Sequence, residues 1–192
     1  MKRKEELKKL LVVVDMVNGF IKKGAMADPY INHITPELIK LVEGTLSEDE
    51  GVAFIKDTHD TNSTEFKKFP PHCVKGSGEE EIIDELKPYE KESLSYEKNS
   101  TSTVFAKNFL SDIDNMKKLR EVIVTGCCTD ICVLNLVIPL INYFDENNKE
   151  VNVVVRQDLV ETYDAPTHGR SEYNEMALKL MKQAGAKVEG EN

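Results

Sequence analysis

The sequence predicts an α/β fold in three layers, with helices on both faces of a mostly parallel central sheet. Short runs of β-branched residues alternate with longer stretches of helical periodicity along the chain. The runs show little polar alternation, which is typical of strands buried on both faces. No linker rich in Gly, Ser or Pro and no internal repeat divides the sequence, so we expect a single domain over residues 1–192.

The predicted strands are short and apolar. Four of them are rich in Val, Ile and Leu and are expected inside the sheet, at residues 10–14, 52–56, 122–125 and 151–155. Two weaker candidates lie at residues 93–96 and 187–189, the second as an edge strand. Strand and helix alternate from end to end, which favours layered packing.

The predicted helices follow the strands. Their apolar periodicity places them at residues 36–46, 79–86, 105–110, 130–144 and 171–184. Gly185 follows the last as a C-terminal stop. The segment 58–78 breaks this regularity, and a loop of that length inside a compact domain is usually functional.

Composition excludes several classes of partner. The chain has 25 Lys and Arg against 34 Asp and Glu, a net charge of −9, which argues against nucleic acid or an anionic membrane. The apolar run at residues 10–14 is too short for a secretory core or a membrane span, so a cytoplasmic protein is expected. The four cysteines are clustered rather than spread as in a disulfide framework, which fits reduced thiols.

A cysteine lies where a buried strand breaks into a helix. The strand at 122–125 ends at Gly126, and Thr129 or Asp130 is expected to cap the following helix. Cys132 then falls in the first turn, where free N–H groups and the helix dipole favour thiolate and can hold an oxyanion. The alternative is a small apolar core residue, an interpretation that suits Cys127 and Cys128.

Acidic residues follow two other strands. Asp15 ends the first strand and Asp57 the second, and ligands bind at the carboxyl ends of strands in open parallel sheets. An aspartate after a strand is often only a turn residue or a cap. Together with Cys132, the two acids favour a site, and Asp15 is placed to take the thiol proton.

The irregular loop holds potential metal ligands. Carboxylate and imidazole are ligands of zinc, iron and manganese, and the candidate ligands here are Asp57, His59, Glu65 and His72. The alternative is a solvated surface loop. His33 and His168 have no comparable neighbours and are expected at the surface or the core edge. Phe66 and Phe69 would add an apolar wall suited to a small aromatic ligand.

Five segments, in this order, carry a family resemblance. They are LVVVDMVNGF at residues 11–20, Asp57-Thr58-His59, FPPHCV at 69–74, Lys98, and GCCTDICV at 126–133. In these the chain resembles the isochorismatase-like cysteine hydrolases, specifically those of the nicotinamidase type. The resemblance implies the isochorismatase-like fold, with Rossmann-like topology.

The resemblance also implies a catalytic triad. Cys132 would be the nucleophile, Asp15 the general base and acid, and Lys98 the electrostatic support. The backbone N–H groups of Cys128 and Cys132 would form the oxyanion hole. A cis peptide would precede Cys128.

A metal and an aromatic pocket are implied as well. Asp57, His59 and His72 match the family's metal ligands, and Glu65 matches a carboxylate that some members use. Zinc is the expected metal, with iron or manganese as alternatives. The residues expected to flank the substrate ring are Phe20 and Phe69. The chain departs from the family at Val17, Gly19 and residues 101–105.

The expected activity is hydrolysis of nicotinamide to nicotinic acid and ammonia through a thioester, a step of NAD salvage. A homo-oligomer is expected from the resemblance. Two alternatives stay open: a hydrolase of another small substrate, such as isochorismate or a carbamoyl compound, and a noncatalytic member of the fold that binds a ligand.

Overall fold

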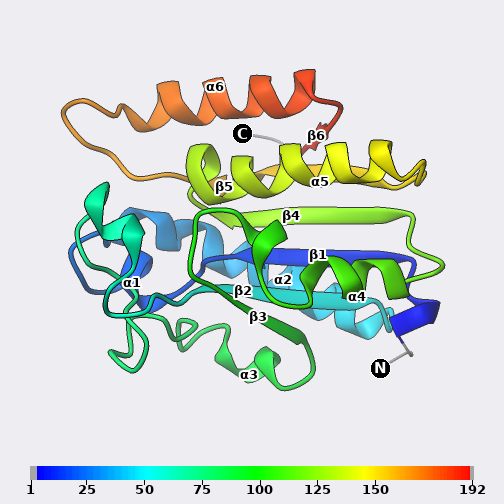
Figure 1. Ribbon diagram of the computed structural model, residues 1–192, viewed down its shortest axis with the longest axis horizontal. Helices are drawn as coiled ribbons and strands as arrows, with labels where there is room; N and C mark the ends of the chain where they lie inside the picture. Colours follow the sequence, from blue (N-terminus) through cyan, green and yellow to red (C-terminus); the bar gives the residue numbers. More distant parts are fainter. Residues whose placement is uncertain (1–3, 191–192) are drawn as a thin grey trace.

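Over residues 4–190, the part of the chain that the computed structural model describes, a six-stranded parallel sheet forms the centre of the molecule (Figure 1). Residues 1–3 and 191–192, the ends of the predicted domain, lie outside the described residues. The strand order is β3-β2-β1-β4-β5-β6. The strands are β1 Lys9–Val14, β2 Gly51–Asp57, β3 Leu94–Lys98, β4 Glu121–Cys127, β5 Asn152–Glu161 and β6 Lys187–Glu189. The predicted mostly parallel sheet is confirmed.

Strand β5 runs further than the predicted 151–155. A register shift between Val124 and Gly126 interrupts the β4–β5 pairing, which resumes as Gly126 with Val160. Gly126 has a φ of +104°, and a Cβ there would lie 2.0 Å from the Val14 carbonyl oxygen. Only glycine therefore fits where β4 passes β1.

Helices cover both faces of the sheet. The helices are α1 Asn18–Ile21, α2 Thr35–Ser47, α3 Lys87–Glu90, α4 Phe109–Asn115, α5 Leu134–Glu146 and α6 Arg170–Gln183. Leu10, Val12 and Val14 pack with α4, α5 and α6, whereas Leu11 and Val13 pack with α1 and α2. In Figure 1, α4 and α5 lie in front of the sheet and α2 behind it. Alternate residues of β1 therefore serve two cores, which gives the three predicted layers.

Two predicted helices are wrong. Residues 79–86 form turns, because their backbone bonds to the segment after β1: Asn18 N–H donates to Glu81 O at 2.9 Å and Gly19 N–H to Glu79 O at 2.8 Å. The predicted helix at 105–110 is replaced by a short turn at Thr103–Phe105 and by α4. Asn108 has a φ of +68° between them, which stops one helix from spanning both.

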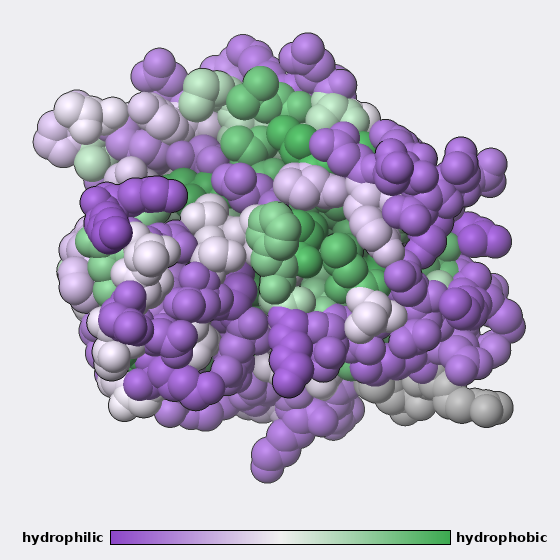
Figure 2. All heavy atoms as spheres, in the orientation of Figure 1, coloured by the Kyte–Doolittle hydropathy of each residue, from purple (hydrophilic) through white to green (hydrophobic). Residues whose placement is uncertain are grey.

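The face of the molecule seen in Figure 2 is mostly hydrophilic, with one apolar area. Figure 2 shows hydrophobic side chains gathered on the face that carries α5. Partly buried apolar residues packed against the core of this face include Val104, Leu134, Ile138 and Leu178. No helix among residues 4–190 is long and apolar enough to cross a membrane.

Candidate active site

Four neighbouring strands deliver charged or nucleophilic side chains at their carboxyl ends. Asp15 follows β1, Asp57 and Lys98 end β2 and β3, and Cys132 lies in a π-type turn, η5 (Thr129–Val133), after β4. The Lys98 Nζ lies 2.9 Å from Asp15 Oδ2, 2.7 Å from Asp57 Oδ1 and 3.6 Å from Cys132 Sγ. The structure thus brings together the three residues expected as a triad, and Lys98 joins them to Asp57.

The buried ammonium of Lys98 is held between two carboxylates. Its side chain is 1% exposed, so burial opposes the charge. Asp15 and Asp57 outweigh that cost and hold the Lys98 pKa well above its ordinary value. Burial likewise acts to raise the Asp57 pKa, but Lys98 and hydrogen bonds from His59 and His72 hold it below its ordinary value. Lys98 and Asp57 therefore form a permanent ion pair.

Asp15 differs from Asp57 in its environment. Burial raises the pKa of Asp15 to about 6, Lys98 opposes this rise, and the Asp57 charge adds to it. The Lys98 ammonium lies 2.9 Å from Asp15 Oδ2, and contacts with Lys98 and with Cys132 both act to lower the Asp15 pKa. The backbone of Asp15 has a φ of +50°, a sparsely populated conformation that is typical of functional sites. Asp15 can thus exchange a proton near neutral pH.

The predicted helix cap is wrong. The residue that precedes η5 is Cys128, in an extended conformation and without a side-chain cap, rather than Thr129 or Asp130. The Ile131 and Val133 N–H groups both donate to the Cys128 carbonyl oxygen at 3.1 Å. Asp130 turns away from this end because Thr162 and His168 bind its carboxylate.

Cys132 rests as a thiol rather than as the expected thiolate. Burial raises the Cys132 pKa well above its ordinary value, although Lys98 acts to lower it. The helix end favours thiolate, but burial and the two nearby carboxylates, Asp15 and Asp57, outweigh it. A nucleophile in this setting needs a proton acceptor, and Asp15 is the carboxylate placed to serve.

The two cysteines before the turn lie in the core. Cys127 is fully buried and its Sγ donates to the Asp15 carbonyl oxygen at 3.3 Å. The peptide between Cys127 and Cys128 is cis, as the resemblance implied.

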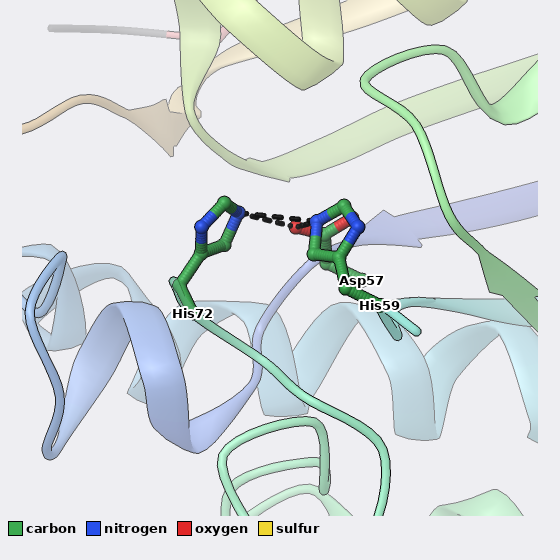
Figure 3. Close-up of side chains that lie close together, drawn as sticks. All are labelled: Asp57, His59 and His72. Carbon is green, nitrogen blue, oxygen red and sulfur yellow. Dashed lines mark hydrogen bonds and ion pairs between the residues drawn. The ribbon is translucent and has the colours of Figure 1, made fainter. Parts of the chain in front are cut away.

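Three potential metal ligands converge at the Asp57 carboxylate, whose other oxygen contacts Lys98. The Nε2 atoms of His59 and His72 lie 3.0 and 3.1 Å from Asp57 Oδ2 and 3.2 Å from each other. Figure 3 shows both rings pointing at the Asp57 carboxylate. All three residues are buried, and their ligand atoms lie within 4.8 Å of one another. A lone pair on each of three neighbouring atoms calls for a shared cation or proton.

Contacts on the far side of each ring set its orientation. His72 Nδ1 donates to the Pro70 carbonyl oxygen at 2.7 Å, which leaves its Nε2 lone pair for the centre. His59 Nδ1 lies 3.0 Å from Asn99 Oδ1 and 3.3 Å from Ser63 Oγ. The donor set and these outer partners fit a divalent metal such as zinc, iron or manganese.

Glu65 is not brought into this group. Its Oε1 accepts a hydrogen bond from Thr101 Oγ1 at 2.8 Å instead, and no metal-sized cluster of the described residues includes it. Glu65 lies at the start of a short turn (Thr64–Lys67) whose cap, Ser63, also contacts His59. The two imidazoles and one carboxylate therefore form the group by themselves in this structure.

Aromatic rings surround the two histidines. Phe20 and Phe69 have ring centroids 5.6 and 6.3 Å from that of His72. Phe66 packs edge-on against both imidazoles, at 5.2 Å from His59 and 5.7 Å from His72. The expected aromatic wall therefore lies beside the candidate metal group.

The departure at Gly19 has a steric basis, whereas nothing in the structure explains the departure at Val17. A Cβ at Gly19 would lie 2.5 Å from Cys73 Sγ, so the buried Cys73 occupies the space that a side chain at position 19 would need. Val17 is fully buried and pairs through its backbone with Ile82. These differences lie beside Asp15 without removing any charged contact of Lys98.

Sequence reasoning missed the groups that orient these side chains. Asn99 and Ser63 contact His59, yet neither occurs in a pattern that would distinguish it from other loop residues. His168, expected at the surface or the core edge, is 7% exposed and bound to Asp130. His33 is half exposed, as expected.

Comparisons with known proteins agree with this geometry. A family model described as the isochorismatase domain matches residues 9–191. Nicotinamidase 1 of Arabidopsis thaliana is 30% identical over 174 residues, which cover 82% of this chain and 71% of the relative.

Solved structures show the same fold. The nicotinamidase PncA from Bacillus subtilis has a TM-score of 0.79 and 26% identity, with 96% of this chain and 100% of that chain covered. The N-carbamoylsarcosine amidase from Thermoplasma acidophilum has a TM-score of 0.78 and 25% identity, with 95% and 96% covered. With the family match over nearly its whole length, the chain belongs to the isochorismatase family of hydrolases.

Proposed function

We propose that this hydrolase is a nicotinamidase, which converts nicotinamide and water to nicotinic acid and ammonia. The observation that carries the proposal is the position of Lys98 Nζ, 2.9 Å from Asp15 and 3.6 Å from the Cys132 sulfur. A thiol, a carboxylate that titrates near neutral pH and a fixed positive charge are the groups that amide hydrolysis through a thioester requires. The similarity to plant and bacterial nicotinamidases supports the choice of substrate.

The first half of the proposed reaction forms the thioester. Cys132 Sγ attacks the amide carbonyl carbon as its proton passes to Asp15. The backbone N–H groups of Cys128 and Cys132 stabilise the oxyanion, each by about 3 kcal/mol of barrier. The tetrahedral intermediate then collapses, the C–N bond breaks, and Asp15 gives its proton to the departing ammonia.

The second half releases the acid. Water attacks the thioester carbonyl as Asp15 again accepts a proton, and collapse of the new intermediate expels the Cys132 sulfur. The sulfur recovers the proton from Asp15. Lys98 keeps its charge throughout, which stabilises both the Asp15 carboxylate and the transient thiolate.

We assign substrate orientation to the candidate metal group next to Lys98. Asp57, His59 and His72 would hold a divalent ion, for which zinc best suits the mixed nitrogen and oxygen donors. When bound, the ion supplies a Lewis-acidic position for the pyridine nitrogen. Phe20 and Phe69 would flank the ring, and their positions beside His72 support that role.

Ammonia release tests the proposal directly. Purified protein is expected to release ammonia from nicotinamide, to lose activity after dialysis against a chelator, and to regain it with added zinc, manganese or iron. Metal content is measured on the same samples. Absence of ammonia release from metal-loaded protein would refute the proposed substrate.

A carbamoyl amide is the second candidate substrate. The structural match to N-carbamoylsarcosine amidase is nearly as close as that to nicotinamidase, and the chain departs from the nicotinamidase-type sequence at residues 101–105, after Lys98. N-carbamoylsarcosine is therefore assayed in parallel. A higher kcat/KM for N-carbamoylsarcosine than for nicotinamide would make the carbamoyl amide the preferred substrate.

The acid side of the pH profile follows from Asp15. Asp15 must be ionised to accept the thiol proton, and its pKa is raised to about 6 by burial, with Lys98 opposing. We therefore expect kcat/KM to fall about tenfold per pH unit below that value, rather than near the ordinary value for aspartate. Steady-state rates with circular dichroism at each pH check this, and full activity down to about pH 5 would contradict it.

The proposal extends to the setting of the enzyme. The proposed reaction would be a step of NAD salvage. We place the enzyme in the cytoplasm, because its four cysteines are all free thiols: Cys73, Cys127, Cys128 and Cys132. We also expect a homo-oligomer, since the apolar area on the α5 face offers surface for a second copy.

A further inference from the structure

Asp130, a carboxylate in the same turn as Cys132, is held by two residues that follow the neighbouring strand β5. Asp130 Oδ1 accepts a hydrogen bond from Thr162 Oγ1 at 2.6 Å, and Asp130 Oδ2 lies 2.8 Å from His168 Nε2. The Asp130 and His168 side chains are each 8% exposed. Thr162 and His168 both lie between β5 and α6, more than thirty positions beyond Asp130. The proposed reaction uses none of these three residues.

The segment that supplies these partners is itself fixed. Ala165 and His168 form a reciprocal pair of backbone hydrogen bonds at 3.0 and 2.9 Å. Arg170 Nε donates to the Thr162 carbonyl oxygen at 2.9 Å, and its guanidinium also binds Asp28. Thr162 and His168 therefore contact Asp130 from a loop that is already fixed, so little conformational entropy is lost in forming the contacts.

The His168 ring is fixed on every side. It stacks between Tyr163 and Tyr173, with ring centroids 3.9 and 3.7 Å away. Its two ring nitrogens lie on opposite edges, with Nδ1 3.1 Å from the Tyr163 carbonyl oxygen and Nε2 2.8 Å from Asp130 Oδ2. A ring held by two faces and two edges is a rigid support for the Asp130 carboxylate.

The turn η5 has few other attachments through its side chains. Cys128 provides no side-chain cap, and the Thr129 hydroxyl has no hydrogen-bond partner among residues 4–190. Ile131 and Val133 are apolar. Apart from the contacts of Cys132 with Lys98 and Asp15, the Asp130 carboxylate is thus the polar side-chain link between η5 and its surroundings in the described structure.

We propose that Asp130, held by Thr162 and His168, is a positioning residue that fixes the turn bearing Cys132. By doing so it keeps the sulfur beside Lys98 and the turn's N–H groups toward the substrate carbonyl. The effect on turnover rests on the proposed function, whereas the effect on the sulfur does not. Sulfur–ammonium attraction falls with distance, so a small movement of η5 lowers the fraction of thiolate.

Matched variants separate positioning from stability. Thr162→Val removes the hydroxyl that binds Asp130 and keeps the side-chain shape, whereas Thr162→Ser keeps the hydroxyl. Asp130→Asn weakens the contact with His168. Asp112→Asn is the control, because Asp112 is a comparable carboxylate that binds Tyr96 and Lys4 away from the site.

Two readouts are taken on each variant. The first is kcat and KM for nicotinamide. The second is the pH dependence of Cys132 alkylation by iodoacetamide, followed by peptide mass spectrometry so that Cys128 is scored separately. Lys98, Asp15 and Asp57 are the charged groups that act on Cys132, beside the Cys128 thiol, and all four remain in every variant. Greater access would raise the limiting rate at high pH, whereas lost positioning shifts the profile to higher pH.

Thr162→Val and Asp130→Asn are expected to lower kcat about tenfold, with KM nearly unchanged, and to shift the alkylation profile upward. Thr162→Ser and Asp112→Asn are expected to match the parent chain. The proposal is overturned if Thr162→Val and Asp130→Asn keep both the parental kcat and the parental profile, or if Asp112→Asn shows the same losses. If the parent chain does not hydrolyse nicotinamide, the proposed function fails and the alkylation profiles still decide the role of Asp130.

Discussion

Replacement of Cys132 by alanine is expected to abolish ammonia release while ligand binding persists. The sulfur is the atom that forms the proposed thioester, and loss of a covalent nucleophile lowers kcat by roughly four orders of magnitude or more. The metal group and the aromatic rings are expected to stay in place, because the contacts that arrange them do not include Cys132. Ammonia assays and calorimetric titration with nicotinamide measure the two effects.

Cys73→Ala is the matched control. Cys73 is also a fully buried free thiol, but its Sγ faces the Glu79 carbonyl oxygen rather than Lys98. It is expected to retain turnover. Turnover by Cys132→Ala close to that of the parent chain would remove Cys132 from the proposed mechanism, whatever the behaviour of the control.

Replacement of Lys98 by methionine is expected to damage both activity and stability. Methionine fills a similar volume but leaves Asp15 and Asp57 buried without their cation. Breaking a buried ion pair by removing one partner costs about 3–5 kcal/mol. Urea unfolding, in the presence of a chelator to exclude metal effects, measures this loss, and ammonia release measures the loss of turnover.

The Lys98→Met deficit is expected to be larger at pH 8 than at pH 5. In the parent chain the Asp57 pKa is lowered, so the stability that Asp57 contributes is present above its unfolded pKa and is lost as pH falls. Without Lys98 that contribution disappears. At low pH, protonation of Asp15 and Asp57 removes the unpaired buried charges and so reduces the destabilisation of the variant. The exposed pair of Lys75 with Glu97 provides the control, since Lys75→Met should change stability little. Equal unfolding midpoints for Lys98→Met and the parent chain would contradict the ion-pair account.

Strand identity could be predicted from sequence because it depends on local pattern. Runs such as residues 10–14 are apolar at every position, which a strand buried on both faces requires. The positions of Asp15, Asp57 and Cys132 followed from the rule that parallel strands present their carboxyl ends to one edge. The position of Lys98 after a weak predicted strand made it a candidate, but only the family resemblance separated it from other lysines, since β3 alternates in burial and its sequence resembles many exposed segments.

The errors arise from contacts that sequence pattern does not contain. The segment 79–86 has helical periodicity, but its backbone bonds to residues after β1. Asp130 is a good helix cap by propensity, yet a distant hydroxyl and imidazole bind it more closely. The resting state of Cys132 depends on burial, which no local motif reports. In each case tertiary structure outweighs a correct local preference.

The position of β3 has a consequence for how the enzyme would fail. This five-residue strand lies at the border of the sheet and pairs on one side with β2, yet it supplies the ammonium on which the two acids and the sulfur depend. Border strands are among the first parts of a sheet to detach under stress. Heating or mild denaturant should therefore abolish activity before the inner strands unfold. Loss of turnover would then report local unfolding of β3 ahead of global unfolding.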